Sequence, residues 1–281
     1  MSEPVNSEET LENLLVQLRA CKKYQGMPEE TLRDILADEL RRQRKPAEAL
    51  KNARAHLHNV LAPYLGDLDY RQARKDLEEA AHASPGSQTP LALRALCETF
   101  LYEHDSTNER LPYLSEFYEQ IFGICGPVKR VLDLACGLNP FALPWMGLPA
   151  GAAYHAYDLI DERVALINQF LRASRREELA EVRDILVRPP DIEADAAFLF
   201  KEAHRLEKRQ KGCNRRLWAA LRVRLLFVSL PNRSLDGQRD LRERMRQLVK
   251  DNLAFEPAEM GELEFPGETV FWMRKQAETG A

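Results

Sequence analysis

Three aspartates stand at the ends of successive segments that we predict to be buried strands: Asp133, Asp158 and Asp184. Small residues follow the first of them, in Asp-Leu-Ala-Cys-Gly-Leu-Asn-Pro over 133–140, and let a ligand approach the backbone at the carboxyl edge of a parallel sheet. Asp158 can accept hydrogen bonds from both hydroxyls of a ribose, and Asp184 can meet an adenine amino group. Solvated acids at strand ends are the alternative for any one of them, but the succession favours a nucleoside site.

The loop after the first predicted strand argues against a dinucleotide. A pyrophosphate-binding loop needs three glycines in the pattern Gly-x-Gly-x-x-Gly, and only Gly137 is present here. The pattern therefore predicts a nucleoside-bearing ligand without a pyrophosphate, and S-adenosylmethionine is the best candidate. The cysteines are odd in number and widely spaced, with no Cys-x-x-Cys pair, which argues against a zinc site and against a disulfide framework.

The elements that must position these acids alternate between strand and helix after His104. Apolar runs predict strands over 131–134, 154–158, 182–187, 196–200, 225–230 and 269–273, with helical segments between most of them. This alternation predicts an α/β fold in which helices cover both faces of a mainly parallel sheet. The last strand follows the region of Phe255 so closely that we expect an antiparallel hairpin at the sheet edge.

The first part of the chain carries a different pattern. Apolar residues recur there at helical spacing, and breakers that contain Gly or Pro separate one run from the next. We predict an all-helical domain over 1–105 and an α/β domain over 106–281. Charges interrupt every apolar run before the ~18 residues that a membrane helix needs. The acidic N-terminus also lacks the apolar region of a secretory signal, so we expect a cytoplasmic protein, with a monomer as the default.

The distribution of charge changes what the composition implies about partners. The chain has a net charge of −4, which alone argues against a nucleic acid. However, residues 41–54 carry a net charge of +5, residues 201–224 of +7 and residues 233–250 of +3. A solvated helix face would explain one such run, whereas three favour a basic surface for phosphates. The predicted RNA contacts are Arg41, Arg42, Arg44, Lys45, Lys51, Arg54, Lys201, Arg205, Lys208, Arg209, Lys211, Arg239 and Arg242.

Three motifs, taken together, are specific to one family. They are Ser-Thr-Asn-Glu-Arg-Leu-Pro over 106–112, Asp-Leu-Ala-Cys-Gly-Leu-Asn-Pro-Phe-Ala-Leu-Pro-Trp-Met over 133–146, and Leu-Glu-Lys-Arg-Gln-Lys-Gly over 206–212. With them the chain resembles the aminoglycoside-resistance 16S rRNA methyltransferases, which modify guanine N7 at position 1405 in the decoding site. The resemblance is dense over 104–235 and thin before it. It implies a Rossmann-like class I methyltransferase fold after the helical domain, S-adenosylmethionine as cofactor, and the 30S ribosomal subunit with its 16S rRNA as partner.

The resemblance also implies roles for individual residues. Arg110 would hold the methionine carboxylate of the cofactor, which suits the parallel donors of a guanidinium. Asp158 would bind the ribose, and Asp184 with Ile185 would contact the adenine. The other expected cofactor contacts are Tyr64, His104, Asp105, Ser106, Ala135, Gly137, Phe200 and Gln210. Lys201 stands where similar enzymes carry a functionally sensitive lysine.

The chemistry of guanine N7 explains why no acid–base pair stands out. N7 is an exposed lone pair that needs no deprotonation, so the enzyme can act by placing the base in line with the activated methyl group. We therefore name no general base, and we interpret Cys136 as a packed small residue. Because N7 faces the deep groove of an RNA helix, the base must be flipped out and stacked on a ring. Phe141, Trp145 and Trp218 are the candidates.

The chain departs from the family pattern in three places. After Lys201, Glu202-Ala203-His204 replaces the usual Leu-Pro, and Ser-Leu-Pro-Asn over 229–232 replaces Ser-Phe-Pro-Thr. Beyond residue 235, Asp-Gly-Gln over 236–238 and then a charged helix replace the Gly-Gly-Arg and Lys-Gly-Met stretch. An enzyme that methylates another rRNA base, such as an adenine at N1, or a small molecule stays open as an alternative. A ribosome-binding module without turnover is a further alternative, against which Asp158 and Arg110 argue.

Overall fold

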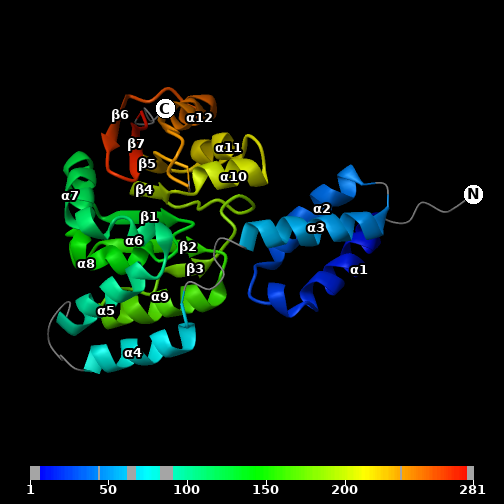
Figure 1. Cartoon of the computed structure of the whole chain (residues 1–281), viewed down its shortest axis with the longest axis horizontal. Helices are drawn as coiled ribbons and strands as arrows, with labels where there is room; N and C mark the ends of the chain where they lie inside the picture. The colour runs from blue at the N-terminus through cyan, green and yellow to red at the C-terminus, as the bar shows by residue number, and fades with distance from the viewer. Residues whose placement is uncertain (1–6, 44, 62–67, 83–90, 235, 277–281) are drawn as a thin grey trace, which may run out of the picture.

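The computed structural model describes residues 7–43, 45–61, 68–82, 91–234 and 236–276, and it consists of a helical bundle beside a helix-covered sheet (Figure 1). The bundle contains α1 (Ser7–Arg19), the short turn η1 (Lys22–Tyr24), α2 (Glu29–Arg42) and α3 (Pro46–Leu61). Leucines at helical spacing form its core, among them Leu15, Leu18, Leu36 and Leu57, which are almost fully buried. Glutamates in the first turn of α2 and arginines in its last turn suit the helix dipole.

The sheet has seven strands in the order β3-β2-β1-β4-β5-β7-β6. Their bounds are β1 (Arg130–Leu134), β2 (Ala153–Asp158), β3 (Ala180–Val182), β4 (Ala194–Phe200), β5 (Val223–Pro231), β6 (Glu259–Glu264) and β7 (Glu268–Arg274). The strands β1 to β5 run parallel to one another, whereas β7 runs antiparallel to β5 and to β6. Apolar residues dominate β1, β4 and β5, which are buried in the middle of the sheet. The predicted α/β fold and the antiparallel hairpin at the edge are confirmed.

Helices cover each face of the sheet over a separate apolar core. One core lies under α4 (Tyr70–His82), α5 (Leu91–Tyr102), α7 (Leu114–Cys125), α8 (Leu143–Met146) and α9 (Asp161–Ala173). The other core lies under α10 (Ala203–Arg209), α11 (Cys213–Ala220) and α12 (Arg242–Asn252). The described part of the chain also contains the short helical turns α6 (Asp105–Asn108), η3 (Leu111–Tyr113) and η4 (Asn139–Ala142). None of the described helices is long and apolar enough to cross a membrane.

The hydrophobic cores divide the helices differently from the boundary predicted at residue 105. Leu77 of α4 and Leu93 and Cys97 of α5 pack into the core of the sheet, and α4 lies along α9 (Figure 1). The core of the bundle draws its described residues from α1, η1, α2, α3 and their connections. Periodicity could not reveal this division, because a helix that covers a sheet has the same apolar spacing as a helix in a bundle.

The strand predicted over 182–187 is wrong in its bounds, since β3 ends at Val182. Asp184 turns the chain: its Oδ1 accepts a hydrogen bond from the N–H of Leu186 at 3.0 Å, and its carbonyl accepts one from the N–H of Arg188 at 2.8 Å. An aspartate that binds the backbone two residues further on favours a turn over a strand.

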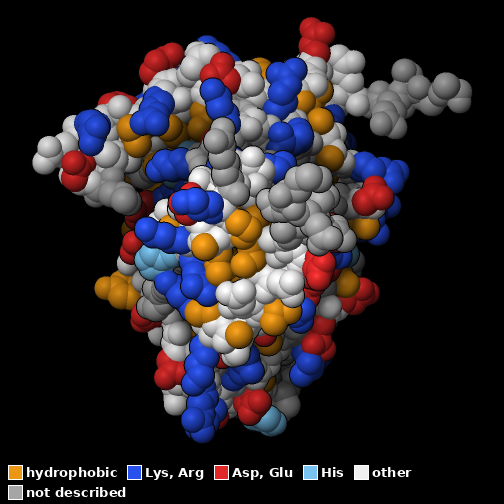
Figure 2. Space-filling view, turned by 90° about the vertical axis from the view of Figure 1, so that its right-hand side faces the viewer, with side chains coloured by type: hydrophobic (Ala, Val, Ile, Leu, Met, Phe, Trp, Pro, Cys, Tyr) orange, Lys and Arg blue, Asp and Glu red, His pale blue; other side chains and the backbone are white. Residues whose placement is uncertain are grey.

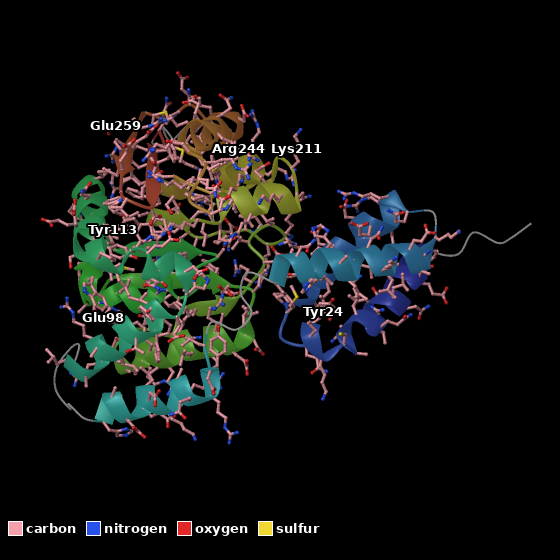
Figure 3. The ribbon with its side chains drawn as sticks, in the orientation of Figure 1. Tyr24, Glu98, Tyr113, Lys211, Arg244 and Glu259 are labelled. Carbon is pink, nitrogen blue, oxygen red and sulfur yellow. The ribbon has the colours of Figure 1, made fainter. Side chains whose placement is uncertain are left out.

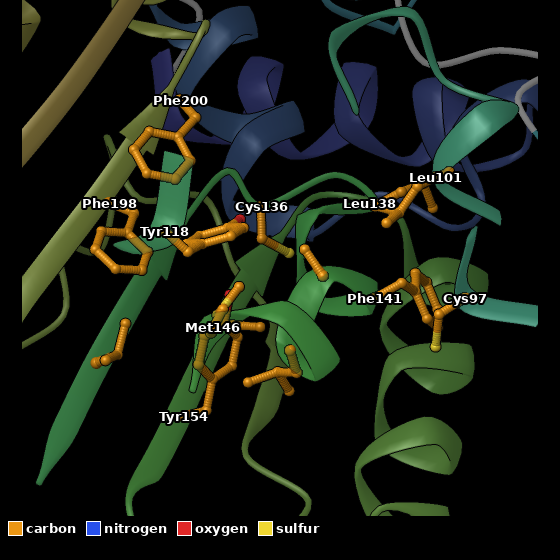
Figure 4. Close-up of a cluster of buried hydrophobic side chains, with 14 of the residues drawn as sticks. Cys97, Leu101, Tyr118, Cys136, Leu138, Phe141, Met146, Tyr154, Phe198 and Phe200 are labelled. Atoms are coloured by element: carbon orange, nitrogen blue, oxygen red, sulfur yellow. The ribbon is translucent and has the colours of Figure 1, made fainter. Parts of the chain in front are cut away.

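Two of the three candidate stacking rings are core residues. Phe141 and Trp218 have an exposed fraction of 0%, and Figure 4 shows Phe141 beside Cys97 and Leu138 in the core of the sheet. The prediction of a base-stacking role is therefore wrong for these two. Trp145 is partly buried against the same core, with the guanidinium of Arg94 4.7 Å from its ring. Cys136 is buried there as well, and burial raises the pKa of its thiol, as expected for a packed residue.

Candidate active site

A cavity of about 640 Å³ lies beyond the carboxyl ends of β1, β2 and β4, a size typical of cofactor sites. It brings together residues that are far apart in the sequence. Asp105, Ala135, Asp158, Asp184 and Ile185 all line it, and all were predicted as cofactor contacts. The carboxyl edge of a parallel sheet is where ligands bind in open α/β folds.

The helical bundle supplies one wall of this cavity through residues that were not predicted, since Tyr64 was the only cofactor contact expected before residue 104. His56, Asn59 and Val60 of α3 line it opposite residues of the sheet edge and α10. Burial lowers the pKa of His56, and so does the nearby Arg209. The only signal in the sequence was two polar residues, His56 and Asn59, beside the apolar positions of a helix, which by itself indicates no ligand.

Asp158 is the most firmly held residue of the cavity wall. Its carboxylate accepts hydrogen bonds from the N–H of Gly137 and the N–H of Ile160, both at 3.0 Å. The guanidinium of Arg163, from α9, donates to both carboxylate oxygens at 3.1 and 3.0 Å. Gly137 and Ala135 adopt left-handed backbone conformations, with φ of 53° and 49°. The chain therefore turns sharply after β1, and the N–H of Gly137 points toward Asp158 at the end of β2. Arg163 was missed, because nothing marked this arginine of an amphipathic helix.

The walls of the cavity fit S-adenosylmethionine. Leu159, Ile185 and Leu206 provide apolar surface for a purine. Asp105, Asp158 and Glu202 line the same space, and their carboxylates suit a ligand with two ribose hydroxyls, an ammonium group and a sulfonium. Asp184 also lines it, but its carboxylate is 1% exposed and is bound by Thr31, Arg209 and Leu186, so the prediction that this carboxylate meets an adenine amino group needs correction.

Asp133 does not line the cavity but supports it from behind. Its Oδ2 accepts hydrogen bonds from the Tyr154 hydroxyl at 2.5 Å and from the Asn139 amide at 3.0 Å. The side-chain Oδ1 of Asn139 accepts in turn from the hydroxyl of Tyr118 at 2.7 Å and from Nη1 of Arg110 at 3.3 Å. Burial raises the pKa of Asp133 to about 7, although these donors oppose the rise.

Arg110 lies in this buried network as the partner of Glu268. Its Nε and Nη2 donate to the two carboxylate oxygens of Glu268 at 2.5 and 2.8 Å, and Nη2 also lies 3.3 Å from the Ser229 hydroxyl. The rings of Phe117 and Phe200 each lie 4.8 Å from its guanidinium carbon. The sequence did not predict Glu268, and the role of Arg110 toward a cofactor carboxylate stays a prediction.

Lys201 follows β4 in a left-handed backbone conformation, with φ of 57°. Its N–H donates to the carbonyl and the hydroxyl of Ser229, which holds this unfavourable conformation in place. Its ammonium forms an ion pair with Glu109 and lies 3.9 Å from Glu268. Because only 10% of its side chain is exposed, the prediction of Lys201 as a surface contact for phosphate needs correction. A role in catalysis stays a prediction.

The remaining predicted cofactor residues lie around the site without lining the cavity. The Ser106 hydroxyl and His104 Nδ1 form a hydrogen bond of 2.8 Å next to Asp105. Phe200 packs in the aromatic core with Phe117 and Phe198, and Gln210 directly follows α10. Tyr64 lies outside the described residues.

Most of the predicted RNA contacts are exposed cations. The exposed ones are Lys51, Arg54, Lys208, Lys211, Arg239, Arg41, Arg42 and Lys45. Arg41 and Arg42 pair with acids of α2, and Lys45, just before α3, pairs with Glu48 of α3. Arg205 and Arg242 are partly buried and pair with Glu202 and Asp240, and Arg44 lies outside the described residues. Figure 2, which looks at the molecule from the side of the bundle, shows Lys and Arg over the upper part of that face and to the left of a group of hydrophobic side chains at its centre. Figure 3 shows Lys211 and Arg244 on the sheet domain.

Arg209 is an exception. Its side chain is 6% exposed, and its guanidinium donates to Asp184 at 2.5 Å. This corrects its prediction as an RNA contact, because a buried guanidinium already bound to a carboxylate is not available to a phosphate.

The family described as "Ribosomal RNA methyltransferase (FmrO)" matches residues 20–261 of this chain. The chain belongs to this family. Among its FmrO relatives, the 16S rRNA (guanine(1405)-N(7))-methyltransferase of Frankia casuarinae is 32% identical over 283 residues, which cover 98% of this chain and 97% of that protein. The protein of the same name from Serratia marcescens is 32% identical over 228 residues, covering 81% of this chain and 83% of that one.

Solved structures confirm the fold of this FmrO protein. The 16S rRNA methylase RmtB superposes with a TM-score of 0.74 at 28% identity, covering 98% of this chain and all of that one (100%). The 16S rRNA methyltransferase RmtF, solved in complex with S-adenosyl-L-homocysteine, gives a TM-score of 0.73 at 29% identity, with coverage of 98% and 100%. The strand order 3-2-1-4-5-7-6 is that of a class I methyltransferase, so the predicted family and fold class are confirmed.

Proposed function

We propose that this chain transfers a methyl group from S-adenosylmethionine to N7 of guanine 1405 in the 16S rRNA of the 30S subunit, and so confers aminoglycoside resistance. The match to the FmrO family over residues 20–261 carries the proposal. The cavity supports it, because its apolar surface and its carboxylates fit this cofactor. A methyl group on N7 leaves a positive charge on the base, which repels a cationic drug at the same place.

Different residues of the cavity bind different parts of the cofactor. The bound cofactor supplies a methyl group on a positively charged sulfonium. Asp158 accepts hydrogen bonds from the ribose, while Ile185 and Leu206 enclose the adenine. The carboxylate of Asp105 faces the positive charges of the ligand, while Glu202 in the same wall pairs with Arg205. Two backbone N–H groups and Arg163 fix the orientation of the Asp158 carboxylate at the end of β2.

Positioning replaces acid–base catalysis in this site. Guanine N7 attacks with a lone pair, so no proton has to leave before the methyl group is transferred. Asp133, with a pKa near 7, would be the obvious base, but its carboxylate is buried behind the cavity and bound to Tyr154 and Asn139. We therefore assign it a structural role.

The 30S subunit is held by the exposed cations of the bundle and of the elements after β4 and β5. Lys51 and Arg54 on α3, Lys208 on α10, and Lys211 and Arg239 in loops lie on separate elements, so they match a folded RNA surface better than a short single strand. The protein acts as a monomer in the cytoplasm, where 30S subunits are found.

The test uses purified protein, tritiated S-adenosylmethionine and 30S subunits. N7-methylguanine is located by borohydride and aniline cleavage followed by reverse transcription. The proposal predicts label in the 30S subunit and a stop at position 1405, and it predicts that Asp158→Asn abolishes both. Absence of label in 30S subunits contradicts it, and a modification at another base, such as an adenine at N1, replaces the target that we propose.

A further inference from the structure

The N-terminal end of α2 is bound to the loop that carries Asp184. The Thr31 hydroxyl donates a hydrogen bond of 2.9 Å to Asp184 Oδ2, and the two side chains are buried, at 0% and 1% exposure. The N–H of Asp184 donates to the Glu30 carboxylate at 3.2 Å, and that carboxylate also pairs with Arg188 at 3.4 Å. The bundle therefore contacts the sheet domain through a buried polar junction.

Arg209, at the end of α10, completes this junction. It donates to the same oxygen of Asp184 at 2.5 Å, and it lies 3.5 Å from Asp34, one turn along α2 from Thr31. The other oxygen of Asp184 accepts the N–H of Leu186, which fixes the turn that carries Ile185. One buried carboxylate thus joins α2, α10 and the loop after β3.

The elements that meet at Asp184 also enclose the cavity. Ile185 comes from the loop and Leu206 from α10, while His56 and Asn59 come from α3, which packs along α2 in the bundle. On the same helix, Lys51 and Arg54 are exposed cations. The bundle therefore carries part of the cofactor cavity on α3 together with part of the basic surface.

We propose that Asp184 is a positioning residue that couples the two binding events, so that cofactor and 30S subunit each strengthen the binding of the other. This inference rests on the proposed function. A cofactor that fills the cavity contacts both the sheet domain and α3, and it fixes the bundle in the orientation that the basic surface needs. By linkage, a 30S subunit that fixes the bundle raises cofactor affinity by the same factor.

The test removes the hydroxyl of Thr31 and leaves every cavity residue in place. In Thr31→Val, Asp184 loses a buried donor, so we expect the Kd for S-adenosylhomocysteine, measured by calorimetry on the free protein, to rise about tenfold. Thr31→Ser keeps the donor and should restore the affinity. Thr269→Val is the matched control, because this buried threonine of β7 donates its hydroxyl to Asn232 at 2.6 Å, away from the junction. It should lose stability but keep its affinity for S-adenosylhomocysteine.

The coupling itself is measured by binding of 30S subunits with and without saturating S-adenosylhomocysteine. The ligand should raise the 30S affinity of the wild type about fivefold and that of Thr31→Val less than twofold. Equal affinities for the ligand in Thr31→Val and wild type, or a 30S affinity of the wild type that the ligand does not change, would overturn the inference. Either result leaves the proposed function intact, provided that the wild-type protein methylates 30S subunits. If the wild-type protein does not methylate them, the proposed function itself is contradicted.

Discussion

Arg110 and Glu268 form a doubly hydrogen-bonded ion pair inside the protein, with side-chain exposures of 1% and 0%. Arg110 directly precedes η3 and Glu268 opens β7, so the pair ties the segment before the sheet to its last strand. Burial alone would raise the pKa of Glu268, but Arg110 and Lys201 hold it below its ordinary value. The carboxylate is therefore ionised and depends on its partner.

Removing one member of this pair should destabilise the protein more than removing both. Arg110→Met and Glu268→Met each leave a buried charge without its partner, and each should lower the free energy of unfolding by ~3–5 kcal/mol. The double variant leaves no unpaired charge and should recover most of that loss. Urea unfolding measures all three, and a double variant that loses as much as the two single variants together contradicts the expected coupling.

The same double variant tests the predicted role of Arg110 toward the cofactor. If Arg110 holds the methionine carboxylate, the stable double variant should bind S-adenosylhomocysteine at least tenfold more weakly than the wild type, because a charge-assisted hydrogen bond contributes ~1.5–3 kcal/mol. Calorimetry on the free protein gives the affinity, and 30S binding should change little. Affinity equal to the wild type would limit Arg110 to its structural role.

Asp133 should make stability fall as the pH rises toward neutrality. Burial raises its pKa to about 7, so the unfolded chain loses this proton at lower pH than the folded protein does. The contribution of Asp133 is fully present below the unfolded pKa of ~4 and is lost as the pH rises through the folded pKa. Asp133→Asn keeps an acceptor for Tyr154 and removes the titration. Its free energy of unfolding should therefore fall less than that of the wild type between about pH 4 and about pH 7, and parallel pH profiles would show that Asp133 does not titrate there.

Gly261 is required by the close approach of Trp272 from the neighbouring strand. A Cβ at position 261 would lie 2.8 Å from atoms of the indole ring, and Gly261 is the register partner of Trp272. Gly261→Ala should lower the free energy of unfolding by ~1–3 kcal/mol. Gly123→Ala in α7 is the control, and it should raise the free energy of unfolding by ~0.5–1 kcal/mol, because alanine favours a helix more than glycine does. A Cβ at position 123 would meet nothing within 4 Å. Thermal unfolding compares them, and equal shifts would contradict the packing argument.

The basic surface of the bundle should appear in the salt dependence of 30S binding. Lys51 and Arg54 are exposed on α3, and removing one cation that binds a phosphate should reduce the slope of log K against log salt by ~1. Lys51→Ala and Arg54→Ala are measured by filter binding at several salt concentrations. Lys75→Ala on α4 makes the same change in charge and should leave the slope unchanged. A slope that falls equally in all three variants would indicate an effect of net charge alone.

The site residues that could be predicted are those that lie at the ends of strands or in short sequence motifs. Ala135, Asp158 and Ile185 follow buried strands or short motifs, so strand periodicity and chain direction are enough to bring them to one edge of the sheet. Glu268 could not be found in this way, because it is an isolated acid that meets Arg110 across a separation of 158 residues. Which long-range partners meet is decided by tertiary packing, and a single sequence carries no direct signal of it.

Not every cation of the basic run over 201–224 contributes to the basic surface. The basic run over 201–224 is real, but Lys201 and Arg209 within it turn inward to Glu109 and Asp184. A run of cations predicts a basic surface only for the side chains that remain solvated, and which of them do so depends on the acids that the fold brings beside them.

The antiparallel direction of β7 sets the order in which the site can form during synthesis. A parallel strand would reach the carboxyl edge of the sheet with its last residue, whereas β7 reaches it with its first, Glu268, near the end of the chain. Arg110, Asn139 and Ser229 all leave the ribosome before their common network has its acidic member. The network takes its final form only after β7 has been made, later than every other element that contributes to it.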